Sequence, residues 1–153
     1  MSAKTAIRPA TVRDAPMLAG LRWEFRAGRD RPVEAEQTFV DRCTAWMARE
    51  LAGSAWRSWV AVDDARIIGQ VWLQLVHKLP NPIGERDRHA YVSNLYVQPS
   101  ARGGVRTALL ETAIAWARDS GVDRIVLWPS ARSVTLYRRH GFTREGEVME
   151  LNC

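Results

Sequence analysis

The sequence predicts a mixed α/β domain in which helices cover a central sheet, and three observations support this prediction. Two helical patterns come first, and strand patterns are then grouped in the middle of the 153-residue chain. The remainder alternates strand, helix, strand and helix, which is typical of a parallel strand pair joined by a helix. The hydrophobic fraction of 46% and charged fraction of 25% are those of an ordinary globular domain. We expect one domain over residues 1–153.

The N-terminal third is expected to hold one short strand and two helices. Residues 6–8 read as a strand that Pro9 ends, and Asp14 is the expected N-cap of the first helix. Apolar residues recur at helical spacing in that helix: Met17, Leu18, Leu21 and Phe25. Residues 28–32 break it, and a second amphipathic helix is predicted over residues 36–51.

The spacing of apolar residues then changes from the helical pattern to the alternation that is typical of strands. Residues 59–62 and 67–76 are strand-like and are joined by the turn signal Asp63-Asp64. In the second strand one face is apolar (Val71, Leu73, Leu75) and the other is mixed (Gln70, Trp72, Gln74). The proline and glycine residues of segment 79–84 predict a loop.

The C-terminal half is predicted to form a strand–helix–strand unit. Residues 90–97 form a long strand that Pro99 stops, and a helix follows over residues 104–120, with Gly121 at its C′ position. Residues 124–128 form a buried strand, which a right-handed crossover should place parallel to strand 90–97. A short helix over residues 134–140 and a last strand over residues 148–151 complete the prediction.

The junction between strand 90–97 and the next helix is a candidate anion site. The strand ends at Val97, the glycine pair Gly103-Gly104 follows, and the helix begins at once. Such a turn brings several main-chain N–H groups and the positive end of the helix dipole to one point. A pyrophosphate fits this cradle. Glycines at a strand-to-helix turn also occur for geometry alone, and that reading stays open.

Two motifs at the proper separation make the chain resemble the GCN5-related N-acetyltransferases. Val97, Pro99, Arg102 and Gly103 follow that family's pattern V-x-P-x-x-R-G-x-G-x-G, and Leu136, Tyr137, Gly141 and Phe142 follow its L-Y-x-x-x-G-F. Segments 93–97 and 7–10 also resemble family strands. The resemblance implies a mostly antiparallel sheet of six to seven strands with a splayed parallel pair and about four helices. The first motif is one residue short, so that Arg106 stands where a small residue is usual.

The resemblance implies acetyl-CoA as the acyl-donor substrate, with no metal. Leu95, Tyr96 and Val97 would offer main-chain groups to the pantetheine arm. The pyrophosphate would lie against a run of consecutive residues: Arg102, Gly103, Gly104, Val105, Arg106 and Thr107. Arg106 is alternatively an exposed helix arginine. Ser130 and Ser133 would contact the pantetheine arm, or Ser130 simply caps the following helix.

Tyr137 and His89 are the candidate catalytic residues. Tyr137 matches the family tyrosine that protonates the departing CoA sulfur, and its alternative is a core tyrosine. His89 lies near the family's usual basic carboxylate, and its ordinary pKa of about 6.5 suits a base. An ordinary exposed histidine is the competing interpretation. Glu85, or ordered water in place of any side chain, are further alternatives.

The function that follows is an N-acetyltransferase in which a primary amine attacks the thioester directly in a ternary complex. The alternative is a catalytically silent acyl-CoA sensor domain. The acceptor is a small-molecule or peptide amine, and Trp23, Phe25 and Trp72 are candidates to line its cleft. Dimers are common in the resembled family, so a homodimer is an open expectation.

Composition excludes other classes of function. The formal net charge is +5, but the arginines are scattered, with no basic run interleaved with aromatics, which disfavours nucleic acid. No apolar run is long enough to span a membrane, and residues 1–8 lack the apolar core of a secretory signal, so we expect a cytoplasmic protein. Cys43 and Cys153 lack the spacing of a metal or redox motif, and we expect free thiols.

Overall fold

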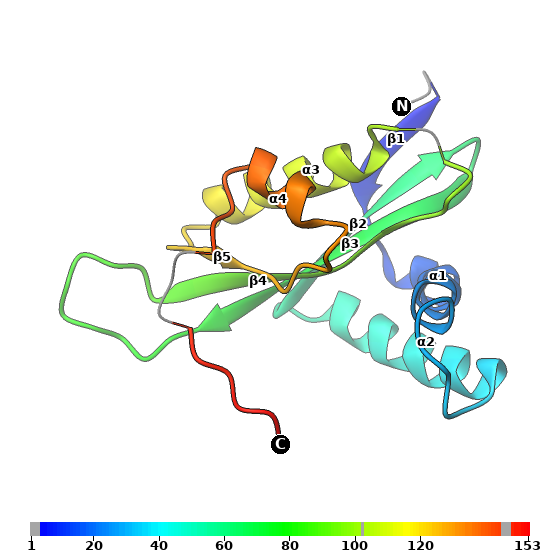
Figure 1. Ribbon diagram of the computed structural model, residues 1–153, viewed down its shortest axis with the longest axis horizontal. Helices are drawn as coiled ribbons and strands as arrows, with labels where there is room; N and C mark the ends of the chain where they lie inside the picture. Colours follow the sequence, from blue (N-terminus) through cyan, green and yellow to red (C-terminus); the bar gives the residue numbers. More distant parts are fainter. Residues whose placement is uncertain (1–3, 102, 145–147) are drawn as a thin grey trace.

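The computed structural model describes residues 4–101, 103–144 and 148–153, and within them five strands form one sheet in the order β1-β2-β3-β4-β5 (Figure 1). Neighbouring strands are antiparallel except for the parallel pair β4 and β5. The elements in chain order are β1 (Thr5–Pro9), the 3₁₀ turn η1 (Val12–Asp14), α1 (Ala15–Ala27), α2 (Glu36–Ala52), β2 (Trp56–Asp63), β3 (Arg66–His77), β4 (Arg88–Val97), α3 (Val105–Asp119), β5 (Ile125–Val126) and α4 (Val134–Arg139).

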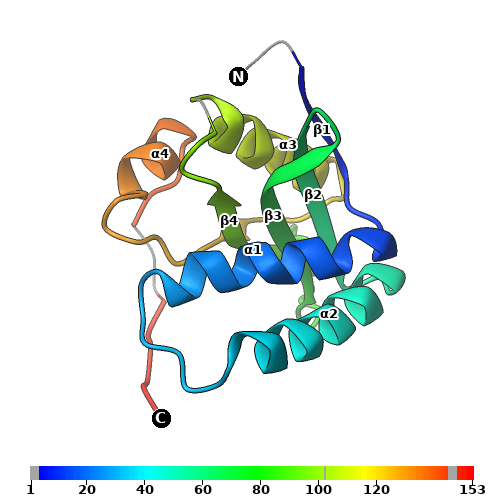
Figure 2. The ribbon, with the colours of Figure 1, turned by 90° about the vertical axis from the view of Figure 1, so that its right-hand side faces the viewer.

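The sheet lies between two helical layers. Figure 2 shows α3 on one face and the α1–α2 pair across the other, with α4 beside the β4 edge. Each face has its own core cluster, because α3 packs with residues such as Val71 and Leu73, and α1 and α2 pack on Trp72. The mixed α/β class expected from the sequence is therefore confirmed, as a three-layer fold.

The mixed face of β3 is as deeply buried as the apolar face. Gln70 is 0% exposed and Trp72 is 2% exposed. Their polar atoms are paired, since the Trp72 indole N–H donates to Gln70 Oε1 at 2.8 Å and Gln70 Nε2 donates to the Leu18 carbonyl at 3.0 Å. The expectation that Trp72 lines an acceptor cleft is thus wrong, because this residue lies in the core under α1 and α2.

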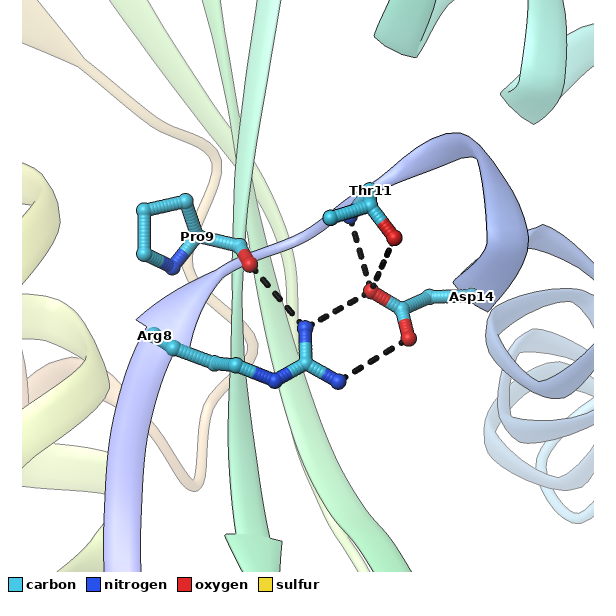
Figure 3. A network of polar contacts seen from close by, with 4 residues as sticks. All are labelled: Arg8, Pro9, Thr11 and Asp14. Atoms are coloured by element: carbon cyan, nitrogen blue, oxygen red, sulfur yellow. Dashed lines mark hydrogen bonds and ion pairs between the residues drawn. The ribbon is translucent and has the colours of Figure 1, made fainter.

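The network around Asp14 anchors α1 to the end of β1 (Figure 3). The Asp14 carboxylate accepts the Thr11 main-chain N–H at 2.7 Å and both Arg8 guanidinium nitrogens at 2.8 and 3.0 Å. Asp14 immediately precedes α1, as predicted, but its side chain does not cap that helix. It closes the preceding 3₁₀ turn instead, because the carboxylate reaches back to Thr11 rather than forward into α1.

Most predicted elements are present within a few residues, and three predictions need correction. The β2–β3 turn is formed by Asp64 and Ala65, both with positive φ, one residue later than predicted. The strand predicted over residues 124–128 is reduced to Ile125–Val126. The last strand predicted over residues 148–151 is not formed, so the described residues hold five strands rather than six to seven.

Burial explains the missing strand. Val148, Met149 and Leu151 are 70%, 94% and 86% exposed, so no face of this segment is covered, and ordering it as a strand would bring no compensating burial. The Trp128 indole N–H donates a hydrogen bond to Glu150, which links this segment to the fold. Across the described residues, no helix has both the length and the apolar character needed to cross a bilayer.

Candidate functional site

The parallel strands β4 and β5 pair only briefly and then separate. Two residue pairs are in register, Ala90 with Ile125 and Tyr91 with Val126. Beyond Tyr91, β4 continues to Val97 along β3, while the chain after β5 leaves the sheet. One edge of the second half of β4 therefore has no strand partner among the described residues.

A β-bulge in β4 marks the point of separation. The register with β3 shifts between Gln70 and Trp72, and Asn94 has a φ of 54° on the opposite strand. A bulge bends its strand and increases the local twist, which turns β4 away from a parallel neighbour. This is the physical reason that β5 is shorter than predicted, since residues after Val126 have no β4 edge within reach.

Two main-chain hydrogen bonds show that the bulge reverses the alternation of β4. Near its start, the Ala90 N–H donates to the Arg124 carbonyl at 3.0 Å, on the β5 side. Just after its end, the Gln98 N–H donates to the Ile68 carbonyl at 2.9 Å, on the β3 side. In a regular strand two residues eight positions apart would point to the same edge. The extra residue at Asn94 accounts for the reversal.

This reversal decides which amides are available at the unpaired edge. Main-chain N–H groups alternate between the two edges of a strand. Because the Gln98 N–H points to β3, the Tyr96 N–H also points to β3. The N–H groups of Leu95 and Val97 then point into the gap left by β5. The side chains agree, because Leu95 and Val97 pack in the same core cluster as Val92, on the α3 face. A substrate lying in the gap can thus pair with these two residues as an added strand would.

The N-terminus of α3 lies just beyond the end of β4 and is uncapped by any described side chain. A turn closed by the Ala101 N–H on the Gln98 carbonyl, at 2.9 Å, leads into the glycine pair. Gly104, the N-cap, has a φ of 92°, a conformation that favours glycine. The first N–H groups of a helix have no acceptor within the helix, so those of Val105, Arg106 and Thr107 are open to an anion. Arg102 lies outside the described residues.

A close approach at Gly69, which the sequence did not reveal as important, brings α3 onto the strand ends. Gly69 pairs with Val97 across the sheet. A Cβ at this position would lie 2.9 Å from Val97 Cγ2, 3.0 Å from the Tyr96 carbonyl and 3.3 Å from Leu109 Cδ1. Any side chain would therefore separate β3 from the β4–α3 junction. Glycine inside a strand pattern was the available signal.

Tyr137 lies on α4 with its ring buried and its hydroxyl free of hydrogen bonds to described residues. It is 9% exposed, and its ring meets that of Phe142 edge-on, with centroids 5.7 Å apart. Burial raises the pKa of Tyr137, and the nearby Arg106 charge acts in the opposite direction. The Arg106 charge, in the first turn of α3, is thus close enough to Tyr137 to act on its phenol electrostatically.

Ser130 and Ser133 are bonded to each other at the start of α4. Their hydroxyls lie 2.9 Å apart, and the Ser133 N–H and hydroxyl both contact the Ser130 carbonyl at 3.0 Å. Ser133 is the N-cap residue, but neither serine side chain caps the helix. Their mutual bonds hold the turn that presents Tyr137.

His89 lies at the far end of β4 from the helix N-terminus. Six positions separate it from Leu95, which corresponds to about 18–20 Å along a strand. It shares a cleft of about 1410 Å³ with Tyr137, bounded by α3, β5 and α4. Nearby, Lys78 contacts the carboxylates of both Glu85 and Asp123. These ion pairs occupy Glu85, which makes it less suited to accept a proton.

The other face of β4 carries a polar pair that the sequence did not predict. Arg22 on α1 donates from Nη1 to Asn94 Oδ1, at the bulge, over 3.2 Å. The available signal was an arginine within an apolar helical stripe, since Leu18, Arg22 and Phe25 share one side of α1. Trp23 packs with Phe39 near the α1–α2 loop, and Phe25 stacks on Tyr96 at 5.0 Å. Of these two acceptor candidates, Phe25 therefore lies beside β4.

The described residues contain no group of three potential metal ligands. The groups available for binding and catalysis are thus an open strand edge, an uncapped helix N-terminus, a buried phenol and an arginine at the bulge. Together these can bind a long molecule with an anionic end and polarise a carbonyl at the bulge.

Comparison with known proteins identifies the family in which this arrangement occurs. The model of the acetyltransferase (GNAT) family matches residues 18–142. A mouse (Mus musculus) protein named probable N-acetyltransferase family 8 member 5 is 34% identical over 98 residues, which are 61% of this chain and 41% of that protein. The chain therefore spans about two-fifths of that curated relative's length.

Solved structures show the same fold. The predicted acetyltransferase of Clostridium acetobutylicum, solved with acetyl-CoA, has a TM-score of 0.80 at 23% identity, covering 97% of this chain and 96% of its own. A GCN5-related N-acetyltransferase from Ralstonia eutropha has a TM-score of 0.78 at 24% identity, covering 97% and 98%. An aminoglycoside N-acetyltransferase in complex with CoA has a TM-score of 0.74 at 19% identity, covering 100% and 97%.

The architecture, with its separated parallel strands and glycine-led helix N-terminus, is thus that of an acyl-CoA N-acyltransferase. The chain belongs to the acetyltransferase (GNAT) family, as its two motifs predicted.

Proposed function

We propose that this protein is an N-acetyltransferase that uses acetyl-CoA as acyl donor and acetylates a primary amine by direct attack on the thioester. The observation that carries the proposal is the gap between β4 and β5, into which the Leu95 and Val97 main chain opens. This edge leads to the uncapped N-terminus of α3. An elongated acyl donor with a diphosphate requires these two features in this order.

The donor lies along the β4 edge with its diphosphate at the helix N-terminus. The N–H groups of Gly104, Val105, Arg106 and Thr107 face the phosphates. Arg102 and Gly103 stay predicted contacts from the sequence motif alone. Leu95 and Val97 hold the pantetheine arm by main-chain hydrogen bonds, next to the Ser130–Ser133 turn. The Leu95 N–H, at the bulge, donates to the thioester carbonyl and stabilises its oxyanion during attack.

Tyr137 is the proton donor to the leaving thiolate. As the tetrahedral intermediate collapses, the C–S bond breaks and the sulfur takes the phenolic proton. Burial raises the pKa of Tyr137, which keeps the phenol protonated at neutral pH. The adjacent Arg106 charge favours the phenolate that forms when the proton leaves. General acid catalysis of this kind is typically worth about 10²- to 10⁴-fold in rate.

The attacking ammonium must lose a proton, since alkylamines have a pKa of about 10. His89 is the proposed acceptor. Its separation of about 18–20 Å from Leu95 along β4 requires that the proton pass along a chain of several water molecules, since each hydrogen bond spans only about 3 Å. If water alone serves, His89→Ala leaves the pH profile of kcat/KM parallel to wild type. If His89 is the base, the profile of His89→Ala departs from that of the wild type, with the largest loss of activity at the low-pH end.

A calorimetric titration with acetyl-CoA, followed by a thiol-release assay on a broad amine panel, tests the proposal. We expect micromolar-range binding and release of CoA thiol that depends on the amine. Binding without turnover on any amine would favour the acyl-CoA sensor, which lacks a transferase step. Absence of binding to CoA or its acyl forms would overturn both functions.

A further inference from the structure

We propose that the acceptor amine carries a carboxylate whose carbon lies within about two bonds of its nitrogen, and that Arg22 binds this carboxylate. The inference rests on the proposed acetyl transfer and names the substrate class for that reaction. It comes from the α1 face of β4, opposite the face on which α3 and Tyr137 lie.

Arg22 is a partly buried cation without a carboxylate partner among the residues that the structure describes. Its side chain donates a hydrogen bond to the neutral Asn94 side chain and forms no ion pair with a described carboxylate. Burial lowers the pKa of Arg22, and the like charge of Arg26 adds to this effect. A guanidinium has five N–H donors, and one of them donates to Asn94. The other donors have no hydrogen-bond acceptor among the described residues.

Two neighbouring arginines differ from Arg22 because each is paired with a carboxylate. Arg26 pairs with Asp30 at 2.8 Å, and Arg42 pairs with Glu34. Arg29 and Arg22 both lie over the Phe25 ring, 4.8 and 5.7 Å from its centroid, and neither forms an ion pair with a described carboxylate. Arg22 is distinguished by its hydrogen bond to Asn94 at the bulge. A substrate carboxylate can supply the counter-ion that Arg22 lacks there.

The position of Arg22 sets the distance between carboxylate and amine. Its Nη1 lies 3.2 Å from Asn94 Oδ1, and covalent geometry keeps Oδ1 within about 5 Å of the next main-chain nitrogen, that of Leu95. The guanidinium is therefore within about 8 Å of the amide that would hold the thioester carbonyl. After allowing about 3 Å for each end contact, about 2 Å remains, so the carboxyl carbon lies no more than about two bonds from the attacking nitrogen.

Aromatic side chains beside Arg22 define where the rest of the acceptor lies. Tyr91, three residues before Asn94 on β4, meets Trp128 edge-on with ring centroids 5.1 Å apart. Trp128, two residues after β5, is 62% exposed. An exposed indole over a tyrosine suits an apolar or aromatic side chain. An amino acid with a free amine and an apolar side chain fits all three features.

Matched amines test the inference. We would measure kcat/KM for L-phenylalanine, for phenethylamine, which lacks only the carboxylate, for O-phosphoethanolamine and for a cationic aminoglycoside. Loss of a charge-assisted contact corresponds to roughly 10- to 100-fold, so we expect phenylalanine to exceed phenethylamine by that factor. In Arg22→Gln the ratio should fall towards one, and Arg22→Lys should restore part of it. Arg26→Gln, whose charge is paired with Asp30, should keep the wild-type ratio.

The ratio is an internal comparison, so partial unfolding of a variant cannot imitate its change. Equal rates for phenylalanine and phenethylamine, or preference for the phosphate or the aminoglycoside, would overturn the carboxylate proposal while leaving acetyl transfer intact. A carboxylate preference that survives in Arg22→Gln would overturn the role of Arg22. Release of no thiol with any amine would overturn the acetyltransferase function, and this inference with it.

Discussion

The two faces of β4 beside the gap offer a substrate different kinds of contact. The donor side (Leu95, Val97, Gly104 and Tyr137) consists largely of main-chain groups, with one buried phenol. The acceptor side (Arg22, Tyr91, Asn94 and Trp128) consists of side chains from α1, β4 and the segment after β5. Main-chain contacts suit a donor that never varies, whereas side-chain contacts can change with the acceptor while the fold stays the same.

The largest expected effect concerns the phenol of the donor side. Tyr137→Phe should lower kcat about 10²-fold or more and change the Kd for acetyl-CoA little, because the ring contact with Phe142 is retained and only the proton is lost. Single-turnover kinetics and calorimetry measure the two quantities. Phe142→Leu, which disturbs the ring contact and keeps the hydroxyl, is the control for packing.

Tyr137 also predicts how kcat depends on pH. Because its pKa is raised above the ordinary value of 10, the phenol remains a proton donor up to that pH, and its loss should reduce kcat only above pH 10. A Tyr137-dependent fall in kcat centred well below pH 10 would contradict the assignment.

The acceptor side rests on the buried Gln70–Trp72 pair beneath α1. Gln70→Met leaves the Trp72 indole N–H and the Leu18 carbonyl without their present partner, and should lower the free energy of unfolding by about 2 kcal/mol. Urea unfolding measures this change. Gln74→Met, on the same strand and less buried, should have a much smaller effect. Similar losses in both variants would show that the buried network contributes little.

The glycine-led helix N-terminus should respond to one added methyl group. Gly104→Ala places a side chain in a left-handed conformation at the donor side, and we expect about tenfold weaker acetyl-CoA binding, or about 1.4 kcal/mol. Gly121→Ala introduces similar strain, at a φ of 72°, at the opposite end of α3. It should lower stability to a similar degree and leave the Kd unchanged. Equal loss of binding in both would indicate a general effect on α3.

The smallest expected effect concerns Asp14, which anchors α1 and therefore acts on the acceptor side. Asp14→Ala should lower the free energy of unfolding by about 1 kcal/mol at pH 7, because Arg8 and Thr11 lose their shared acceptor. The hydrogen bond from Arg8 is the main cause that lowers the pKa of Asp14 below 3.8. Its contribution is thus complete above about pH 4 and is lost as the pH falls below that value.

The wild type and Asp14→Ala should therefore converge in stability as the pH falls through the lowered pKa of Asp14, as measured by chemical unfolding at several pH values. Asp64→Asn, which removes an exposed pair with Lys4 and keeps a residue that tolerates the positive φ of this position, is the control and should differ little from wild type. A difference that stays constant down to the lowest pH at which the wild type is folded would exclude the carboxylate as its source. The effect on acceptor KM should exceed that on acetyl-CoA binding, since α1 carries Arg22.

Local signals explain why the donor side was largely predictable. Pro99, Gly104 and Gly121 restrict or free the backbone where they stand, and the position and ends of α3 follow from them. The motif around Tyr137 likewise predicted α4 to within a residue. The strand at residues 124–128 was overestimated, because its length depends on whether β4 remains alongside. That depends on a bulge at Asn94, for which the sequence carries no clear mark.

The sequence by itself determined the elements, the family and the glycine-led turn, since each depends on residues that are neighbours along the chain. Tertiary structure alone decided the reversal of β4, the burial of Trp72 and the meeting of Arg22 with Asn94, residues 72 positions apart. The physical reason is that a backbone conformation is encoded by local residue types. The surroundings of a side chain depend on how distant elements pack, which one sequence does not reveal.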